Sequence, residues 1–165
     1  MQEKWEQLTM VFAKMLAIYQ ELLALSKQKC DILVQSNVKE LELLMEKEET
    51  LFFEVTKLDR TSKEISKELA LPYGVTEEEA VLSKVLQLAE QEGVCELKNV
   101  RQELREVLLD IKEVNALNQK LVEQGLTIVN YSLNVLAQSS VGPTYHPNES
   151  KSFAPPQKAL FDSKA

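Results

Sequence analysis

The six residues QSNVKE, at positions 35–40, decide how this chain folds, because they interrupt an otherwise helical sequence. Asn37 is a favourable N-cap residue, and Glu40 follows three positions later, where its side chain can reach back as the partner of a capping box. The segment therefore predicts the end of one helix and the immediate start of another. A connection this short favours an antiparallel helical hairpin.

Residues that are apolar or small, with the exception of Glu48, recur at steps of three and four on both sides of this turn, the spacing that keeps side chains on one helix face. Before the turn they are Trp5, Leu8, Phe12, Met15, Tyr19, Leu22, Ser26, Cys30 and Leu33. After it they are Leu41, Leu44, Glu48, Leu51, Val55, Leu58, Ser62, Ile65 and Leu69. We therefore expect helices over about residues 3–35 and 38–70.

Two residues end the second helix, because Pro72 cannot continue it and Gly74 supplies a turn. Thr76 and Glu79 then have the spacing of another capping box. A short helix is expected to follow over about residues 77–91.

Gly93 marks a break before the longest helical segment, which we expect over about residues 95–137. If this segment is one helix, it is about 60 Å long. Its seam of core positions consists of Leu97, Val100, Leu104, Val107, Ile111, Val114, Asn118, Leu121, Gly125, Ile128, Ser132 and Val135.

The composition agrees with a helical protein, since the 165 residues include only four Gly and five Pro. We predict an all-α fold, an antiparallel bundle of long coiled-coil-like helices over residues 1–137: a helical hairpin plus a long third helix, with a short helix between. Residues 138–165, rich in Ser and Pro, are predicted to form a flexible tail. A net charge of −7 makes nucleic acid an unfavourable partner.

The sequence predicts a cytoplasmic protein without membrane insertion. No window approaches 18 uninterrupted apolar residues, and the first residues, MQEKWEQL, lack the basic and apolar regions of a secretory signal. Cys30 and Cys95 are far apart and lack CxxC or CxxH spacing. We interpret both as buried or half-buried small hydrophobic residues, with no disulfide and no metal.

No catalytic constellation, metal site or cofactor site is predicted. The single histidine, His146, lies in the predicted tail, and the four glycines are too scattered for a phosphate-binding loop. The acidic run MEKEET, residues 45–50, is interpreted as a solvated helix face. An enzyme is therefore disfavoured.

Charge disappears towards the end of the long helix. Residues 124–148 contain no Lys, Arg, Asp or Glu, whereas a 27% charged content predicts about seven. The stripe beside the seam is polar upstream, but downstream it turns apolar, and the helix becomes apolar over about half its circumference. This apolar stripe consists of Val122, Leu126, Val129, Leu133 and Leu136.

Two interpretations of this stripe remain open. It is bundle core, covered by the short helix, or it is an interaction surface for a helical partner. In the second case Ile128 and Tyr131 lie at its margin.

Three stretches resemble the flagellar export chaperones of the FlgN type, over residues 22–148. They are the hairpin LLALSKQKCDILVQSNVKELELLMEKEETLFFEVTKLDR, the later VNALNQKLVEQGLTIVNYSLNVL with Asn115, Asn118 and Leu121 at three-residue steps, and PTYHPN. The resemblance implies a cytosolic, non-enzymatic chaperone that holds the C-terminal helical regions of hook-associated flagellar proteins. Such a protein prevents their premature assembly and assists their delivery to the flagellar type III export apparatus.

The interaction surface and the resemblance together predict the partner-binding residues Val122, Leu126, Ile128, Val129, Tyr131, Leu133 and Leu136. Tyr145 is a further candidate, as an aromatic residue that docks on the export gate. The alternative function is a self-associating structural or adaptor coiled coil, although the breaks along the chain favour a chain folded back on itself. A weak homodimer that hides Leu126 is compatible with either function.

Overall fold

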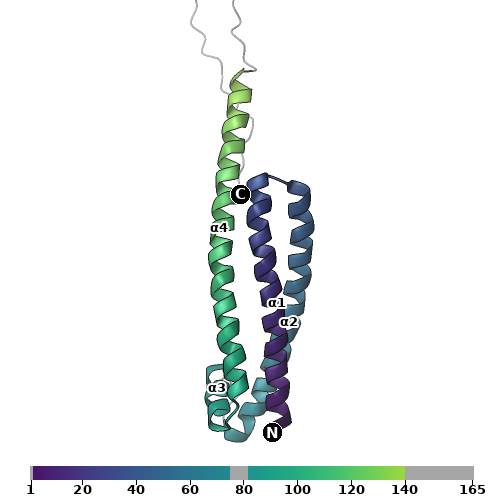
Figure 1. Ribbon diagram of the computed structural model, residues 1–165, viewed down its shortest axis with the longest axis vertical. Coiled ribbons are helices and arrows are strands. Elements are labelled where there is room, and N and C mark those ends of the chain that lie inside the picture. Colours follow the sequence, from purple (N-terminus) through teal and green to yellow (C-terminus); the bar gives the residue numbers. More distant parts are fainter. Residues whose placement is uncertain (1, 75–81, 140–165) are drawn as a thin grey trace, which may run out of the picture. The chain divides into compact units, whose positions relative to one another are not determined.

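The computed structural model, shown in Figure 1, describes residues 2–74 and 82–139, and every regular element in these ranges is helical. The all-α prediction is therefore confirmed. The elements are α1 (Gln2–Gln35), α2 (Val38–Ala70), the 3-10 helix η1 (Leu71–Tyr73), α3 (Leu82–Gln91) and α4 (Cys95–Ser139). The capping box predicted at Thr76 and the predicted tail from residue 140 onward lie outside the described residues.

The chain divides into two compact units, Met1–Thr127 and Ile128–Ala165, and α4 contributes to both. All the packing described below belongs to the first unit. The division of the chain into a bundle and a tail near residue 137 stays a prediction.

The turn between α1 and α2 has the hydrogen bonds of a Schellman motif. The Ser36 N–H donates to the Leu33 carbonyl, and the Asn37 N–H donates to the Ile32 carbonyl, both at 3.2 Å. The Asn37 side chain then accepts a hydrogen bond from the Glu40 N–H at 3.4 Å. Asn37 thus closes α1 and caps α2 at once, which confirms it as the predicted N-cap and brings the two helices together as a hairpin.

The main core lies where four helices meet, and it fills the region beside the N-terminal turns of α1 and α4. Figure 1 shows α1 and α2 side by side, with α3 beside the start of α4. The buried residues of this cluster come from all four helices: Trp5, Leu8, Phe12, Leu16, Leu69, Ala70, Val85, Leu86, Ala89, Leu97 and Leu104. The short helix α3 therefore covers the beginning of the α4 seam.

A second, smaller core cluster continues along the hairpin. Its buried members are Met15 and Leu22 from α1 and Val55 from α2, with Ile111 of α4 packed against them. The predicted seams of α1 and α2 are thus the buried faces of these helices, as the three-four spacing requires.

Further along, α4 contacts α1 through a buried polar residue. The Asn118 Nδ2 donates to the Ser26 carbonyl oxygen at 2.8 Å, and both residues are buried. The Asn118 Oδ1 is buried without a hydrogen-bond partner in the described part of the chain. This contact fixes the register of α4 against α1, because only one axial position places the amide on that carbonyl.

A second Schellman motif ends α3. Gly93 has a positive φ of 76°, its N–H donates to the Glu90 carbonyl, and the Val94 N–H donates to the Ala89 carbonyl at 2.8 Å. The predicted break at Gly93 is therefore confirmed, and α4 begins two residues later.

Two burial predictions need correction. Cys30 is half-buried as expected, but Cys95 is exposed. Cys95 lies two positions before the fully buried Leu97, which rotates it by about 200° to the opposite side of the helix. The acidic run at residues 45–50 is not entirely solvated either, because Glu48 is buried and forms an ion pair with Lys29 of α1.

Helix α1 is long and apolar enough to cross a membrane by length and composition alone, since an 18-residue window has a mean hydropathy of 1.5. Charged and polar residues interrupt this window, so a search for uninterrupted apolar runs does not find it. A buried core helix gives the same signal as a membrane span. We interpret α1 as a core helix, because its apolar face packs against α2, α3 and α4.

Candidate partner-binding surface

The burial of α4 changes along its length. Leu97, Leu104 and Asn118 are 0%, 6% and 5% exposed, and Leu121 is half-buried. From residue 122 to residue 137, by contrast, every residue is exposed. The first part of α4 therefore belongs to the bundle core, whereas its later part contributes no buried side chain to it.

All seven residues predicted to bind a partner lie on the exposed part of α4. Their exposed fractions are 44% for Val122, 57% for Leu126, 65% for Ile128, 53% for Val129, 70% for Tyr131, 55% for Leu133 and 64% for Leu136. Within the first unit, α3 packs near Leu97 and Leu104, whereas Val122 and Leu126 are exposed.

Five of these residues follow one another at steps of three and four along α4, so they share one side of the helix. We call Val122, Leu126, Val129, Leu133 and Leu136 the α4 face. Val122 and Leu126 belong to the first unit, and the other three belong to the second unit of the same continuous helix.

Polar side chains around the α4 face make hydrogen bonds within the helix. The Thr127 hydroxyl donates to the Glu123 carbonyl, and the Ser132 hydroxyl donates to the Ile128 carbonyl, both at 2.9 Å. Because these hydroxyls already have acceptors, a partner can cover the surface without leaving them unsatisfied. The segment is therefore suited to apolar contacts.

The glycine in this segment leaves open space beside the backbone. A Cβ atom added at Gly125 would meet no atom within 4 Å. Its small size is thus not required by packing against the described residues.

Sequence reasoning missed a second group of exposed apolar side chains, on α2. Phe52 and Phe53 are 51% and 62% exposed, and the Lys57 Nζ lies 4.2 Å from the centroid of the Phe53 ring. The sequence does contain a signal for this group, since two adjacent aromatic residues on one helix cannot both point into a narrow seam, and at least one of them must be exposed. The cation–π contact gives the Phe53 ring a local partner.

The predictions about chemistry concern residues both inside and outside the part of the chain that the structure describes. Within residues 2–74 and 82–139, no group of three His, Cys, Asp or Glu side chains could hold a metal ion. Tyr145 and His146 lie outside the described residues.

The fold defines an all-helical bundle protein whose longest helix is buried along its first part and exposes apolar side chains along the rest. The chain belongs to the FlgN family: the family model described as "FlgN protein" matches residues 1–152. The resemblance found in the sequence is therefore confirmed. The chain is also similar to the uncharacterized protein YvyG of Bacillus subtilis (strain 168), with 25% identity over 153 residues, which cover 92% of this chain and 93% of YvyG. No solved structure gives a significant match.

Membership of this family has consequences for function. It implies a role as a flagellar export chaperone that binds hook-associated proteins, and chaperones of this family are cytoplasmic and non-enzymatic.

Proposed function

We propose that the protein is a cytoplasmic chaperone that binds the C-terminal helical regions of hook-associated flagellar proteins through the α4 face. It prevents their premature assembly and assists their delivery to the flagellar type III export apparatus. One observation carries this assignment: burial along α4 ends at residue 122, while the apolar pattern continues. An exposed apolar stripe on a helix is the feature that pairs with an apolar stripe on another helix.

The size of the face indicates reversible binding. Full burial of one Val or Leu side chain contributes about 1.5–3 kcal/mol, so a half-exposed one contributes about 1 kcal/mol more when a partner covers it. Val122, Leu126, Val129 and Leu133, four of the five residues of the α4 face, together would then supply about 4 kcal/mol, before the costs of association. A micromolar complex requires about 8 kcal/mol. We therefore expect the client to cover Ile128 and Tyr131 as well.

Tyr145 is proposed as a contact with the export apparatus, separate from the client contact. An aromatic side chain suits such docking, because it supplies a large apolar contact area with a polar group at its end. Its substitution by Ala should leave client binding unchanged and reduce export.

The experiment that tests the client site compares two double variants of the full chain. Leu126→Asp with Leu133→Asp places charge on the α4 face, whereas Leu109→Asp with Leu117→Asp makes the same change elsewhere on α4. Leu109 and Leu117 are 52% and 50% exposed, which matches the test pair. Each protein is incubated with purified hook-associated proteins, and recovery of the complex is measured by pull-down.

We expect the first double variant to lose the client and the control to retain it, with equal helicity and equal melting temperature. If the first variant keeps its fold and recovers as much client as the unchanged chain, the α4 face is not the client site. If the chain instead associates only with itself, the coiled-coil alternative replaces the chaperone.

A further inference from the structure

Two pockets lie between α1 and α2, the helices that Figure 1 shows side by side in the hairpin. Their volumes are about 430 Å³ for the first and about 380 Å³ for the second, which is nearer the turn between the two helices. Both pockets belong to the first unit. The apolar side chains that line them are Ala17, Ile18 and Leu58 in the first and Leu25, Ile32, Leu43 and Leu44 in the second.

The two pockets open on the same side of the hairpin, because their apolar residues recur at seven-residue steps along each helix. Seven residues are almost two full turns, so residues at this spacing share one side. From Lys14 in the first pocket to Gln35 in the second, α1 rises about 31 Å. We call the apolar strip along this side the hairpin strip, and it consists of Ile18, Leu25 and Ile32 of α1 and Leu44, Leu51 and Leu58 of α2.

Helix α4 packs on a different side of α1. Asn118 reaches the carbonyl of Ser26, which lies one residue beyond Leu25 and is therefore rotated by about 100° around the helix. No α3 or α4 residue that the structure describes lines either pocket. Leu43, beside the strip, is 60% exposed, and Ile18 is half-buried. The rest of the described chain therefore leaves the hairpin strip uncovered.

The charged side chains along the hairpin strip differ between its two ends. Two Lys and one Glu line the first pocket, whereas one Lys, one Asp and one Glu line the second. All six are exposed, and none of them forms an ion pair within the described part of the chain. They are Lys14, Glu54 and Lys57 at the first pocket and Asp31, Glu40 and Lys47 at the second.

The order of these charges on α2 is complementary to itself when it is reversed. From the first pocket towards the turn it is Lys57, Glu54, Lys47 and Glu40, so the sign alternates and the two ends are opposite. Residues 48–51 contain both the midpoint between Lys57 and Glu40 and the midpoint between Glu54 and Lys47. These midpoints are about 3 Å apart along the helix. A single two-fold axis there can therefore bring each charge near an opposite one.

We propose that the hairpin strip binds the same strip of a second copy of this chain, across a two-fold axis near residues 48–51 of α2. The axis exchanges the two ends, so Lys57 of one copy faces Glu40 of the other, and Glu54 faces Lys47. On α1, Lys14 faces the end that carries Asp31. The four helices of the two hairpins then run antiparallel to their neighbours, as in a four-helix bundle with an isologous interface.

Charge also selects this orientation over a parallel one. If the two hairpins lay parallel and face to face, α1 of one copy would lie over α2 of the other at the same level. Lys14 would then meet Lys57, and Asp31 would meet Glu40, since each of these pairs lines one pocket. Like charges placed against each other at an interface are unfavourable.

The size of the strip is suited to a dimer that dissociates readily. Two helices about 20 Å wide together and about 31 Å long give a footprint of about 600 Å² on each copy. A standard interface buries about 800 Å² on each partner, so we expect an affinity in the micromolar range that depends on the charges. The dimer does not use Val122 or Leu126, and this inference does not depend on the proposed function.

The test reverses the charges of one end at a time in the full chain. Lys14→Glu with Lys57→Glu makes both ends negative, whereas Asp31→Lys with Glu40→Lys makes both ends positive. Analytical ultracentrifugation measures association at about 100 µM, where a micromolar dimer is populated. We expect the unchanged chain to be a dimer, each double variant to associate at least tenfold more weakly, and an equimolar mixture of the two variants to recover a heterodimer.

A fourfold variant separates the loss of the interface from a loss of folding. All four substitutions in one chain keep the net charge and exchange the signs of the ends, so we expect this chain to dimerise within about twofold of the unchanged one. Matched controls reverse exposed charges on α4 instead, Arg101→Glu with Arg105→Glu and Glu103→Lys with Asp110→Lys. We expect both controls to remain dimers.

Three results would overturn the proposal. The first is an unchanged chain that is monomeric at about 100 µM. The second is a failure of both the mixture and the fourfold variant to dimerise. The third is a loss of association in the α4 controls equal to that in the strip variants, which would assign the effect to net charge.

Discussion

Ser36 has a backbone conformation that suits glycine better than serine. Its φ of 56° is the only positive φ among the described non-glycine residues. The left-handed conformation costs a residue with a Cβ about 1–2 kcal/mol, and glycine avoids most of that cost but loses more entropy on folding. Ser36→Gly should therefore raise the free energy of unfolding by about 0.5–1 kcal/mol in urea titrations.

The control places glycine where the backbone is helical. Gln20→Gly, at an exposed position within α1, should lower the free energy of unfolding by about 1 kcal/mol. If both glycine substitutions lower the free energy of unfolding by similar amounts, the turn does not hold Ser36 in the left-handed region.

Gly125 offers the opposite case, a glycine in an ordinary helix with open space beside it. Replacing it with Ala removes the entropy cost of glycine, which is worth up to about 1 kcal/mol of helix stability. We expect Gly125→Ala to slow hydrogen exchange of the amides around residue 125. Unchanged exchange rates would mean that α4 is already fully formed there.

At the scale of elements, the contact between α4 and α1 combines one hydrogen bond with one unsatisfied acceptor at Asn118. Asn118→Leu removes the buried acceptor and adds apolar burial, so it should raise the free energy of unfolding by about 1–2 kcal/mol. Asn118→Ala loses the hydrogen bond and leaves a void, so it should lower that free energy by about 1–2 kcal/mol. If Asn118→Leu instead lowers the free energy of unfolding, the hydrogen bond of the amide contributes more to stability than the apolar burial of a leucine at this position.

The ion pair between Lys29 and Glu48 joins α1 to α2, and their side chains are only 21% and 11% exposed. Lys29→Met leaves the Glu48 carboxylate without its partner, and we expect a loss of about 1–3 kcal/mol in the free energy of unfolding. Adding Glu48→Leu should recover stability to that of the unchanged chain, because an apolar pair of similar volume needs no desolvation of charge.

A matched exposed pair provides the comparison. Lys4 and Glu68 join the same two helices at 2.9 Å, with side chains 44% and 55% exposed. Lys4→Met should cost less than about 1 kcal/mol. If it costs as much as Lys29→Met, burial does not determine the strength of these pairs.

At the scale of the whole molecule, the stability of the first unit should not depend on the exposed end of α4. Residues 122–137 contribute no buried side chain. We expect a chain that ends at Thr127 to melt within about 2 °C of the full chain by circular dichroism, since losses well below 1 kcal/mol shift the melting temperature by only a few degrees. A fall of 10 °C or more would identify the removed segment as core.

Sequence periodicity predicted the fold because burial in a helical bundle follows the three-four spacing directly. Leu8, Leu69 and Leu97 were seam positions in the sequence and are fully buried in the structure. The hairpin also depended on local signals, since Asn37 can cap a helix whatever surrounds it.

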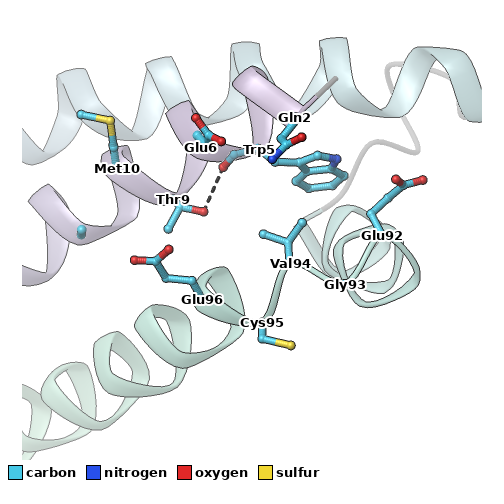
Figure 2. A pocket seen from close by; sticks show the side chains of 11 residues that line it. Gln2, Trp5, Glu6, Thr9, Met10, Glu92, Gly93, Val94, Cys95 and Glu96 are labelled. Atoms are coloured by element: carbon cyan, nitrogen blue, oxygen red, sulfur yellow. Dashed lines mark hydrogen bonds between the residues drawn. The ribbon is translucent and has the colours of Figure 1, made fainter.

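Periodicity could not decide which apolar residues are covered. Leu104 and Leu133 have the same chemistry and lie on the same helix, but the first is 6% exposed and the second is 55% exposed. The periodic pattern identifies which side of a helix is apolar, but it does not indicate how far along that helix the neighbouring helices extend. The cavity between the first turns of α1 and the α3–α4 turn, shown in Figure 2, could not be predicted for a related reason, because its two walls are some 90 residues apart in sequence.

The absence of charge around the α4 face also determines how proteases can act on it. Trypsin cleaves after Lys and Arg, and the chain has neither between Lys120 and Lys151. Trypsin therefore leaves the whole face on one fragment, whether or not a client is bound, and its digestion pattern cannot report binding there. Chymotrypsin cleaves after Leu and Tyr, which form much of this surface, so protection from chymotrypsin at Leu126, Tyr131 and Leu133 would map a bound client directly.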